Sequence, residues 1–138
     1  MLYFNDGPKI RLIMPMPAQM KKTLVLGASD NPQRYSYLAV NRLRSKGHPV
    51  VAIAKRKGKV ADVDLDTEQI AYPDVDTVTL YLNPGTQQQY YDYILSLHPK
   101  RIIFNPGAEN PELEKLAKAN GIQPMAACTL VLLSTGQY

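Results

Sequence analysis

The sequence predicts an α/β domain with a mostly parallel, doubly wound sheet that carries helices on both faces. Three observations support this fold class. Apolar runs of strand length alternate with helical segments of about 10–15 residues along the chain. Gly and Pro mark most boundaries between the two kinds of segment. The length of 138 residues and the hydrophobic content of 45% suit one domain with a substantial core.

The first half of the chain is expected to run strand, helix, strand. Thr23–Leu26 and Val50–Ala54 are apolar and read as buried strands. The helix between them is expected from Gln33 to Lys46, and Gly47 is a suitable C-terminal stop. Residues 58–74 have mixed charge and weak periodicity, so they should hold a short edge strand and a connection.

The second half continues the alternation. Its expected elements are strand Thr77–Leu82, helix Thr86–Leu97, strand Arg101–Phe104, helix Pro111–Asn120, strand Gln123–Ala126 and closing helix Thr129–Thr135. Thr86 and Asn110 are candidate N-caps, and Gly121 is a C-terminal stop. Successive strands joined by crossover helices lie parallel, which gives a single Rossmann-like domain with four or five main strands.

A sheet of this kind also predicts where a ligand binds. In doubly wound sheets the ligand lies beyond the carboxyl ends of the strands, where the strand order reverses. The first strand begins one half of the sheet, and the strand after the long connection begins the other. The crevice is therefore expected between Gly27–Arg34 and Asn83–Pro84.

The composition narrows the class of protein. The formal charge is +4 and the pI is about 9.2, which favours an anionic partner. Basic and aromatic residues are poorly interleaved, so nucleic acid is not expected. No apolar run approaches the roughly 20 residues that span a bilayer, so no membrane association is expected. The single cysteine, Cys128, excludes an internal disulfide and suits a cytoplasmic location, and the two histidines show no metal-ligand spacing with it.

Residues 1–19 differ from the rest of the chain. They contain three prolines and show no sustained period. Met20 directly precedes the basic pair that leads into the first strand, so we expect residues 1–19 to be an extension outside the fold and 20–138 to form the domain. The alternative is a genuine arm that packs on the surface or on a partner subunit.

The loop after the first strand suits a phosphate group. Gly27 allows a tight turn and a close backbone approach, and Ala28 and Ser29 lead towards the helix, whose amides and dipole favour an anion. Ser29 adds a hydroxyl donor, and Arg34 brings a guanidinium. The loop is neither a full G-x-G-x-x-G fingerprint nor a P-loop, so an ordinary turn capped by Ser, Asp or Asn side chains is the alternative.

A basic run follows the second strand. A site for NAD would place an acidic residue there to hold the ribose hydroxyls. This chain instead has Lys55 and Arg56, followed by Lys57, which suit a phosphorylated ribose and leave NADP or coenzyme A. A solvated surface loop is the alternative interpretation.

Several motifs taken together resemble the small CoA-binding-domain family, the stand-alone relatives of the N-terminal domain of the succinyl-CoA synthetase alpha subunit. The order is Gly-Ala-Ser…Pro-x-Arg, a basic second-strand end, Asp-x-Val before an Asn-Pro turn, a glycine loop and a late cysteine. The segments that carry it are Thr23–Arg34, Val50–Arg56, Val78–Pro84, Ile102–Glu109 and Gly121–Cys128. The resemblance covers essentially all of residues 20–138.

The resemblance implies a role for each motif in binding coenzyme A or an acyl-CoA. The implied pyrophosphate loop is Gly27, Ala28 and Ser29 with Arg34, and the implied contacts to the adenosine end and its 3′-phosphate are Lys55 and Arg56. The implied pantetheine contacts are Asn83 and Pro84 on one wall, and Asn105, Pro106 and Gly107 in the next loop.

The sequence shows no catalytic group with a readable partner. His48 and His98 are expected in surface loops at the strand ends opposite the crevice, and Cys128 is expected to be a small buried residue. The alternative for Cys128 is a thiolate near the thiol of the ligand, where it could exchange with a disulfide of the cofactor. Glu109 and Glu112 are expected to complement a helix dipole. The ligase reaction of the larger relatives needs a phosphorylated histidine from a second domain, so it is not expected here.

The function expected from these features is a non-enzymatic CoA-binding or regulatory module. An NADP-dependent oxidoreductase and a CoA-dependent subunit that acts with a partner chain are the alternatives. The sequence leaves open a protein partner or a homo-oligomer.

Overall fold

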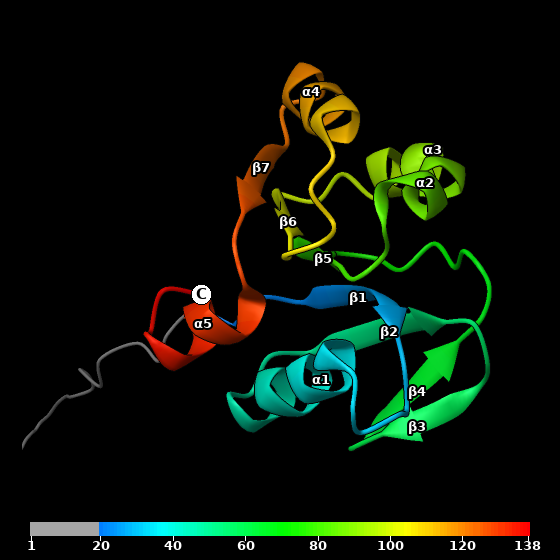
Figure 1. Ribbon diagram of the computed structural model, residues 1–138, viewed down its shortest axis with the longest axis vertical. Helices are drawn as coiled ribbons and strands as arrows, with labels where there is room; N and C mark the ends of the chain where they lie inside the picture. Colours follow the sequence, from blue (N-terminus) through cyan, green and yellow to red (C-terminus); the bar gives the residue numbers. More distant parts are fainter. Residues whose placement is uncertain (1–19) are drawn as a thin grey trace, which may run out of the picture.

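A seven-stranded sheet forms the centre of the computed structural model, which describes residues 20–138 (Figure 1). The strand order is β3-β4-β2-β1-β5-β6-β7, and every neighbouring pair is parallel except the β3–β4 hairpin. The strands are β1 Thr23–Ala28, β2 Val50–Ala54, β3 Gly58–Val60, β4 Val63–Asp66, β5 Thr77–Leu80, β6 Arg101–Phe104 and β7 Gln123–Ala126. The α/β, Rossmann-like fold class is thus confirmed, whereas the expectations for residues 1–19 lie outside the described residues.

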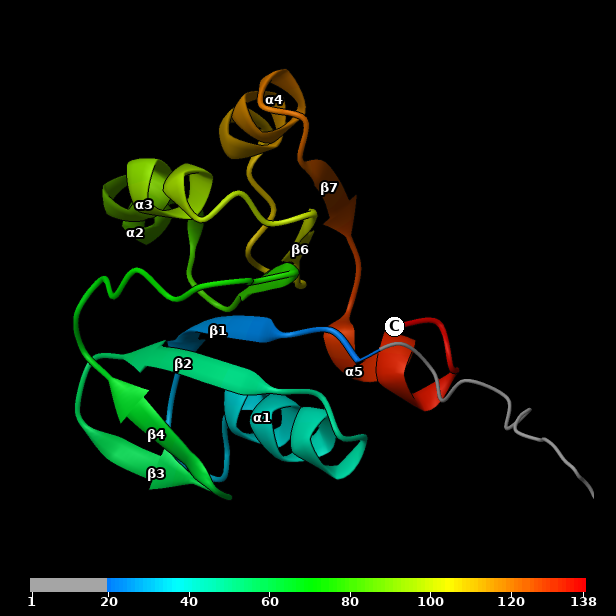
Figure 2. The same cartoon turned by 180° about the vertical axis from the view of Figure 1, so that it is seen from behind.

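Helices cover both faces of the sheet (Figure 2). One face carries α1, Tyr35–Ser45, and α5, Thr129–Ser134, which contact each other. The other face carries α2 Pro84–Gln87, the 3₁₀ turn η1 Gln88–Tyr90, α3 Tyr91–Ser96 and α4 Pro111–Ala119. None of the helices in residues 20–138 has the length and apolar character that a bilayer crossing requires.

The two hydrophobic layers follow from the two-residue period of the strands. In β1, Leu24 and Leu26 pack with Ile94 and Leu113 on the α3–α4 face. Val25 points the other way and joins the core beneath α1 and α5. All three β1 side chains have no exposed surface, so β1 is the central strand on which both layers rest.

Two sequence expectations need correction. Residues 58–74 were expected to hold one short edge strand and a connection, but residues 58–66 form the β3–β4 hairpin and the connection follows it, which brings the sheet to seven strands. The expected helix Thr86–Leu97 is divided into α2, η1 and α3, and Asn83 rather than Thr86 caps its start. The Asn83 Oδ1 accepts a hydrogen bond from the Thr86 amide at 2.9 Å, and Pro84 occupies the first helical position, where it needs no amide proton.

The expected surface position of His48 is also wrong. Its side chain is only 6% exposed, and its Nδ1 accepts a hydrogen bond of 2.9 Å from the Lys21 amide. The imidazole lies 5.0 Å, centroid to centroid, from the ring of Tyr138, which also stacks on the Arg101 guanidinium at 4.3 Å. His48 is therefore part of a buried cluster at the amino ends of the strands, while His98 is exposed as expected.

We expect the folded state to lose stability as the pH falls below about 6.5, the ordinary pKa of histidine. Burial lowers the pKa of His48, and the charges of Lys21 and Arg101 lower it further. The unfolded chain therefore binds a proton that the folded chain excludes, and protonation would also remove the acceptor that the Lys21 amide uses. Urea denaturation followed across this pH range measures the effect.

The matched variants are His48→Asn and His98→Asn. Asparagine at 48 keeps a hydrogen-bond acceptor but does not titrate, so this part of the pH dependence should disappear even though the variant is less stable overall. The exposed His98 provides the control, and its variant should keep the pH dependence of the parent. A parent slope that survives in His48→Asn would contradict the assignment.

Candidate functional site

A cleft of about 970 Å³ opens at the carboxyl ends of four adjacent strands. It lies where the sequence predicted a crevice. Strand β1 pairs with β2 on one side and with β5 on the other, so the order in which strands are added to the sheet reverses at β1. Four loops border it, one after each of β2, β1, β5 and β6. The lining side chains and backbone belong to Gly27–Asn31, Gln33–Ser36, Ile53–Arg56, Tyr81–Asn83, Thr86, Gln89, Tyr90 and Pro106–Ala108.

Gly27 lies within β1, one residue before the carboxyl end of the strand. Its φ is +94°, and the pairing of β1 with β2 shifts by one residue between Leu26 and Ala28. A Cβ added at Gly27 would lie 2.9 Å from both Leu82 Cδ2 and the backbone carbonyl carbon of Tyr81. Only glycine therefore allows the loops after β1 and β5 to approach this closely.

In the rest of the loop after β1, side chains accept hydrogen bonds from amides of the loop itself, and no side chain caps the amino end of α1. The Asn31 amide donates to Ser29 Oγ at 3.0 Å, and the Gln33 amide donates to Asn31 Oδ1 at 2.9 Å. The N-cap of α1 is Arg34, which supplies no side-chain cap, and the first turn of α1 has no acidic residue. Side-chain hydrogen bonds thus shape the loop, but no side-chain cap or acidic residue offsets the positive end of the α1 dipole, which can therefore attract an anion in the cleft.

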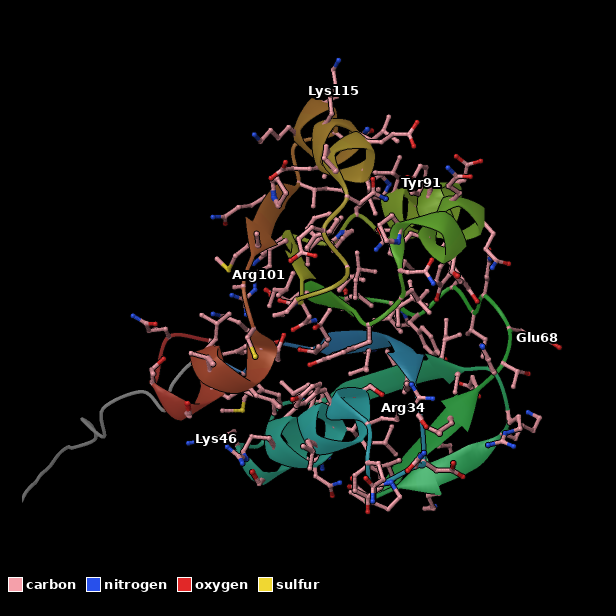
Figure 3. The ribbon with its side chains drawn as sticks, viewed as in Figure 1. Arg34, Lys46, Glu68, Tyr91, Arg101 and Lys115 are labelled. Carbon is pink, nitrogen blue, oxygen red and sulfur yellow. The ribbon has the colours of Figure 1, made fainter. Side chains whose placement is uncertain are left out.

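The basic loop after β2 lies against the first loop. A Cβ added at Gly58 would lie 2.7 Å from Asp30 Oδ2, so the two loops are in direct contact. Lys55 and Arg56 are exposed and line the cleft, and neither forms a salt bridge with a carboxylate of residues 20–138. The open end of α1, the Arg34 guanidinium (labelled in Figure 3) and these two cations therefore border one space.

Comparison with known proteins identifies the family. The family model described as the CoA binding domain matches residues 21–134. The chain belongs to this family. The resemblance found in the sequence is thereby confirmed, although no curated protein matches the chain.

Solved structures support the same fold for this CoA-binding domain. An uncharacterised protein of known crystal structure is 51% identical, has a TM-score of 0.85, and is matched over 88% of this chain and 100% of its own. A hypothetical protein from Pyrococcus horikoshii OT3 is 22% identical, with a TM-score of 0.77 and coverage of 85% and 84%. A Thermus thermophilus protein is 23% identical, with a TM-score of 0.76 and coverage of 86% and 91%.

Most of the residues that the sequence proposed for the CoA-binding domain meet in the cleft, but two do not line it. Pro84 forms the start of α2, and Asn105 is 2% exposed. The Asn105 Nδ2 donates to Thr79 Oγ1 at 2.7 Å and to Leu80 O at 2.9 Å, and its Oδ1 accepts from the Thr129 amide at 2.9 Å. The side-chain amide of Asn105 thus links β5, β6 and the start of α5, and both its nitrogen and its oxygen form hydrogen bonds within the protein.

Several lining residues escaped the sequence analysis. One group is Thr86, Gln89 and Tyr90, which follow the Asn-Pro turn at helical spacing. The i, i+3, i+4 relation among them was a readable signal for one helical face. Tyr81 and Leu82 also line the cleft, and burial raises the pKa of Tyr81 above its ordinary value.

A buried glutamine holds two walls of the cleft in place from behind. Gln87 has no exposed surface, and its Nε2 donates to Leu82 O and to Ala108 O, both at 2.8 Å. Its Oε1 accepts a hydrogen bond of 2.8 Å from Asn110 Nδ2, and Asn110 in turn caps α4. The loops after β5 and β6 are therefore tied to each other and to two helices.

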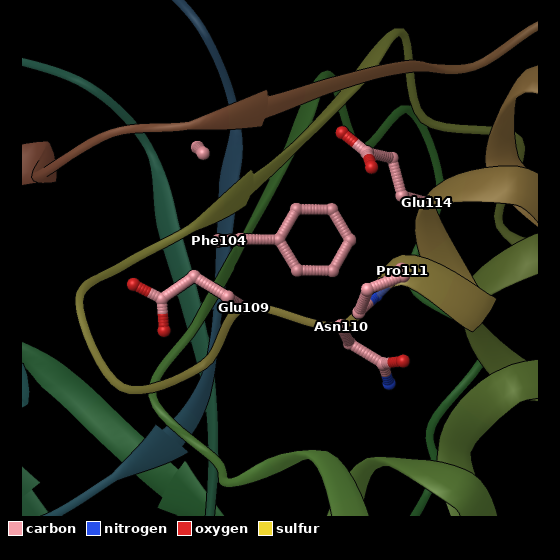
Figure 4. A pocket seen from close by; sticks show the side chains of 6 residues that line it. Phe104, Glu109, Asn110, Pro111 and Glu114 are labelled. Carbon is pink, nitrogen blue, oxygen red and sulfur yellow. The ribbon is translucent and has the colours of Figure 1, made fainter.

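The remaining reactive groups lie outside the cleft. Cys128 is partly exposed but does not line it, so the expected burial is only partial. A separate cavity of about 80 Å³ lies between Phe104, Asn110 and Pro111 and is flanked by Glu109 and Glu114 (Figure 4). It is far smaller than the cleft. Residues 20–138 hold no group of three or more His, Cys, Asp or Glu side chains arranged for a metal ion.

Proposed function

We propose that the chain binds coenzyme A or an acyl-CoA in this cleft. The pyrophosphate lies at the amino end of α1, near Gly27, Ser29 and Arg34, and the 3′-phosphate lies at Lys55 and Arg56. The observation that carries the proposal is the convergence on one cleft of an uncapped helix end and two cations that form no salt bridge with any carboxylate of residues 20–138. A helix amino terminus and a guanidinium are both suited to phosphate oxygens, and membership of the CoA binding domain family supports this choice of ligand.

We further propose that the protein acts in the cytoplasm as a binding or regulatory module and does not catalyse the ligase reaction. Among the described residues, the cleft lining contains one carboxylate, Asp30, and no histidine or cysteine. His48 is engaged at the opposite edge of the sheet, with its Nδ1 hydrogen-bonded to the Lys21 amide. Chemistry on a bound acyl group would therefore depend on a partner chain, whose co-purification would favour that alternative.

Isothermal titration calorimetry with CoA, dephospho-CoA and NADP tests the ligand. CoA should bind best. The double variant Lys55→Ala, Arg56→Ala should weaken CoA binding about tenfold more than dephospho-CoA binding. Hydrogen bonds to charged groups contribute about 1.5–3 kcal/mol each, and solvent screening reduces this contribution at an exposed site. Equal loss for both ligands would contradict the 3′-phosphate assignment, and a preference for NADP would contradict the proposed ligand.

A matched control separates local from overall charge. Lys115, which is labelled in Figure 3, and Lys118 lie on exposed positions of α4 and do not line the cleft. The variant Lys115→Ala, Lys118→Ala removes the same two charges and should leave CoA affinity unchanged. Native mass spectrometry of freshly purified protein gives an independent readout, in which CoA should appear as a bound mass.

A further inference from the structure

The cleft is electrically asymmetric along its length. Its cations, Arg34, Lys55 and Arg56, all come from the loops after β1 and β2. The walls after β5 and β6, by contrast, contain no Lys or Arg, and the chain has none between Lys59 and Lys100. The half that holds the cations also contains Asp30, the one carboxylate among the described lining residues, so its lining keeps a net positive charge and favours anions. The lining of the other half contains no cation that would do so.

A carboxylate stands just outside the cleft lining, directly behind the wall that follows β6. The Oε1 of the exposed Glu109 accepts a hydrogen bond of 2.8 Å from the amide of Gly107, which lines the cleft. The first turn of α4 adds Glu112 and Glu114 on the same side of the sheet. Because β2 and β6 are separated by three strand-to-strand steps, the basic loop and the Gly107 loop stand about 14 Å apart.

This asymmetry fixes the direction of a bound CoA and restricts its acyl group, an inference that rests on the proposed function. The phosphates occupy the cationic half, so the pantetheine extends across β1 and β5 towards the Gly107 loop. We infer that Glu109 sets acyl specificity: the cleft accepts free CoA and neutral acyl-CoA and disfavours acyl groups that end in a carboxylate. A second negative charge placed near Glu109 would meet uncompensated repulsion, because the Gly107 amide already donates to Glu109.

Butyryl-CoA and succinyl-CoA test this inference, since they share a four-carbon acyl chain and differ in a terminal methyl or carboxylate. Calorimetry should show succinyl-CoA binding about five- to tenfold more weakly, and the ratio should shrink as the ionic strength rises. In Glu109→Gln the ratio should fall towards one. Glutamine keeps an oxygen that can accept from the Gly107 amide, so this variant removes the charge and preserves the loop.

Glu114→Gln is the matched control. Glu114 lines the same small cavity as Glu109, but no hydrogen bond among the described residues joins its side chain to a residue of the cleft lining, so the variant should keep the ratio of the parent protein. Equal affinities for the two acyl-CoAs, or a ratio unchanged in Glu109→Gln, would overturn the inference while leaving CoA binding intact. Loss of binding for CoA itself would instead overturn the proposed function.

Discussion

Replacing Gly27 with alanine is expected to destabilise the protein by about 3 kcal/mol and to abolish CoA binding. Two costs combine. A side chain at a φ of +94° strains the backbone, and the new Cβ would press on the Tyr81 backbone and the Leu82 side chain, both at 2.9 Å. Tyr81 and Leu82 both belong to the cleft wall, so this wall must move outward to relieve the contact. Urea denaturation measures the first effect, and calorimetry with CoA measures the second.

Gly121→Ala separates strain from contact. Gly121 also has a positive φ, of +73°, but an added Cβ there would meet nothing within 4 Å, and the residue lies beyond α4, away from the cleft lining. We expect this variant to lose about 1 kcal/mol and to bind CoA normally. If Gly27→Ala were no less stable than Gly121→Ala, the close approach of the two loops would have no energetic weight.

Replacing Gln87 with leucine is expected to cost about 3 kcal/mol of folding stability, because a buried and a part-buried carbonyl oxygen lose the side-chain donor that Gln87 supplies. Those oxygens belong to Leu82 and Ala108, and each accepts from Gln87 Nε2 at 2.8 Å. Leucine fills a similar volume, so the loss reports on hydrogen bonding rather than on a cavity. CoA affinity should fall as well, since both carbonyls belong to residues that line the cleft.

The neighbouring Gln88 offers the control for this change. It is exposed and its side chain does not line the cleft. Gln88→Leu should therefore alter stability by less than about 0.5 kcal/mol and leave CoA affinity unchanged. Similar losses in the two variants would show that the buried amide contributes nothing beyond helix propensity.

The sequence predicted most of the fold because its signals were local. The strands Val50–Ala54, Arg101–Phe104 and Gln123–Ala126 have the expected bounds, and Asn110 caps α4 as expected. The helix start at Asn83 was missed because both Asn83 and Thr86 are good caps. Pro84, which needs no amide proton at the first helical turn, favours the earlier one.

The sequence could predict which loops form the candidate site, because it shows where the strands end, but it could not predict how each side chain is oriented. Every parallel strand delivers the loop at its carboxyl end to the same edge, so the loops at Gly27, Lys55, Asn83 and Gly107 could be grouped from the sequence. The orientation of a particular side chain could not. Asn105 begins such a loop, yet its amide turns towards Thr79 and Thr129, because those buried polar groups need partners.

His48 illustrates the same limit at the other edge of the sheet. Its place before a proline, between a helix and a strand, is typical of an exposed connection. Its burial depends on Tyr138, 90 residues later in the chain, and on the Arg101 guanidinium. Contacts between segments so distant in the sequence leave no local pattern from which burial could be inferred.

The hydrogen bonds of Gln87 belong to the framework of the cleft and not to the surface that a ligand would contact. These hydrogen bonds run behind the walls, whereas Thr86, Gln89 and Tyr90 face the opening from the same stretch of chain. Thr86 and Gln89 can therefore vary without loosening the architecture, whereas Tyr90 also packs against the core and against Tyr93. Because the two sets of residues are separate, proteins that share this framework can change their ligand preference through a few substitutions at the cleft surface.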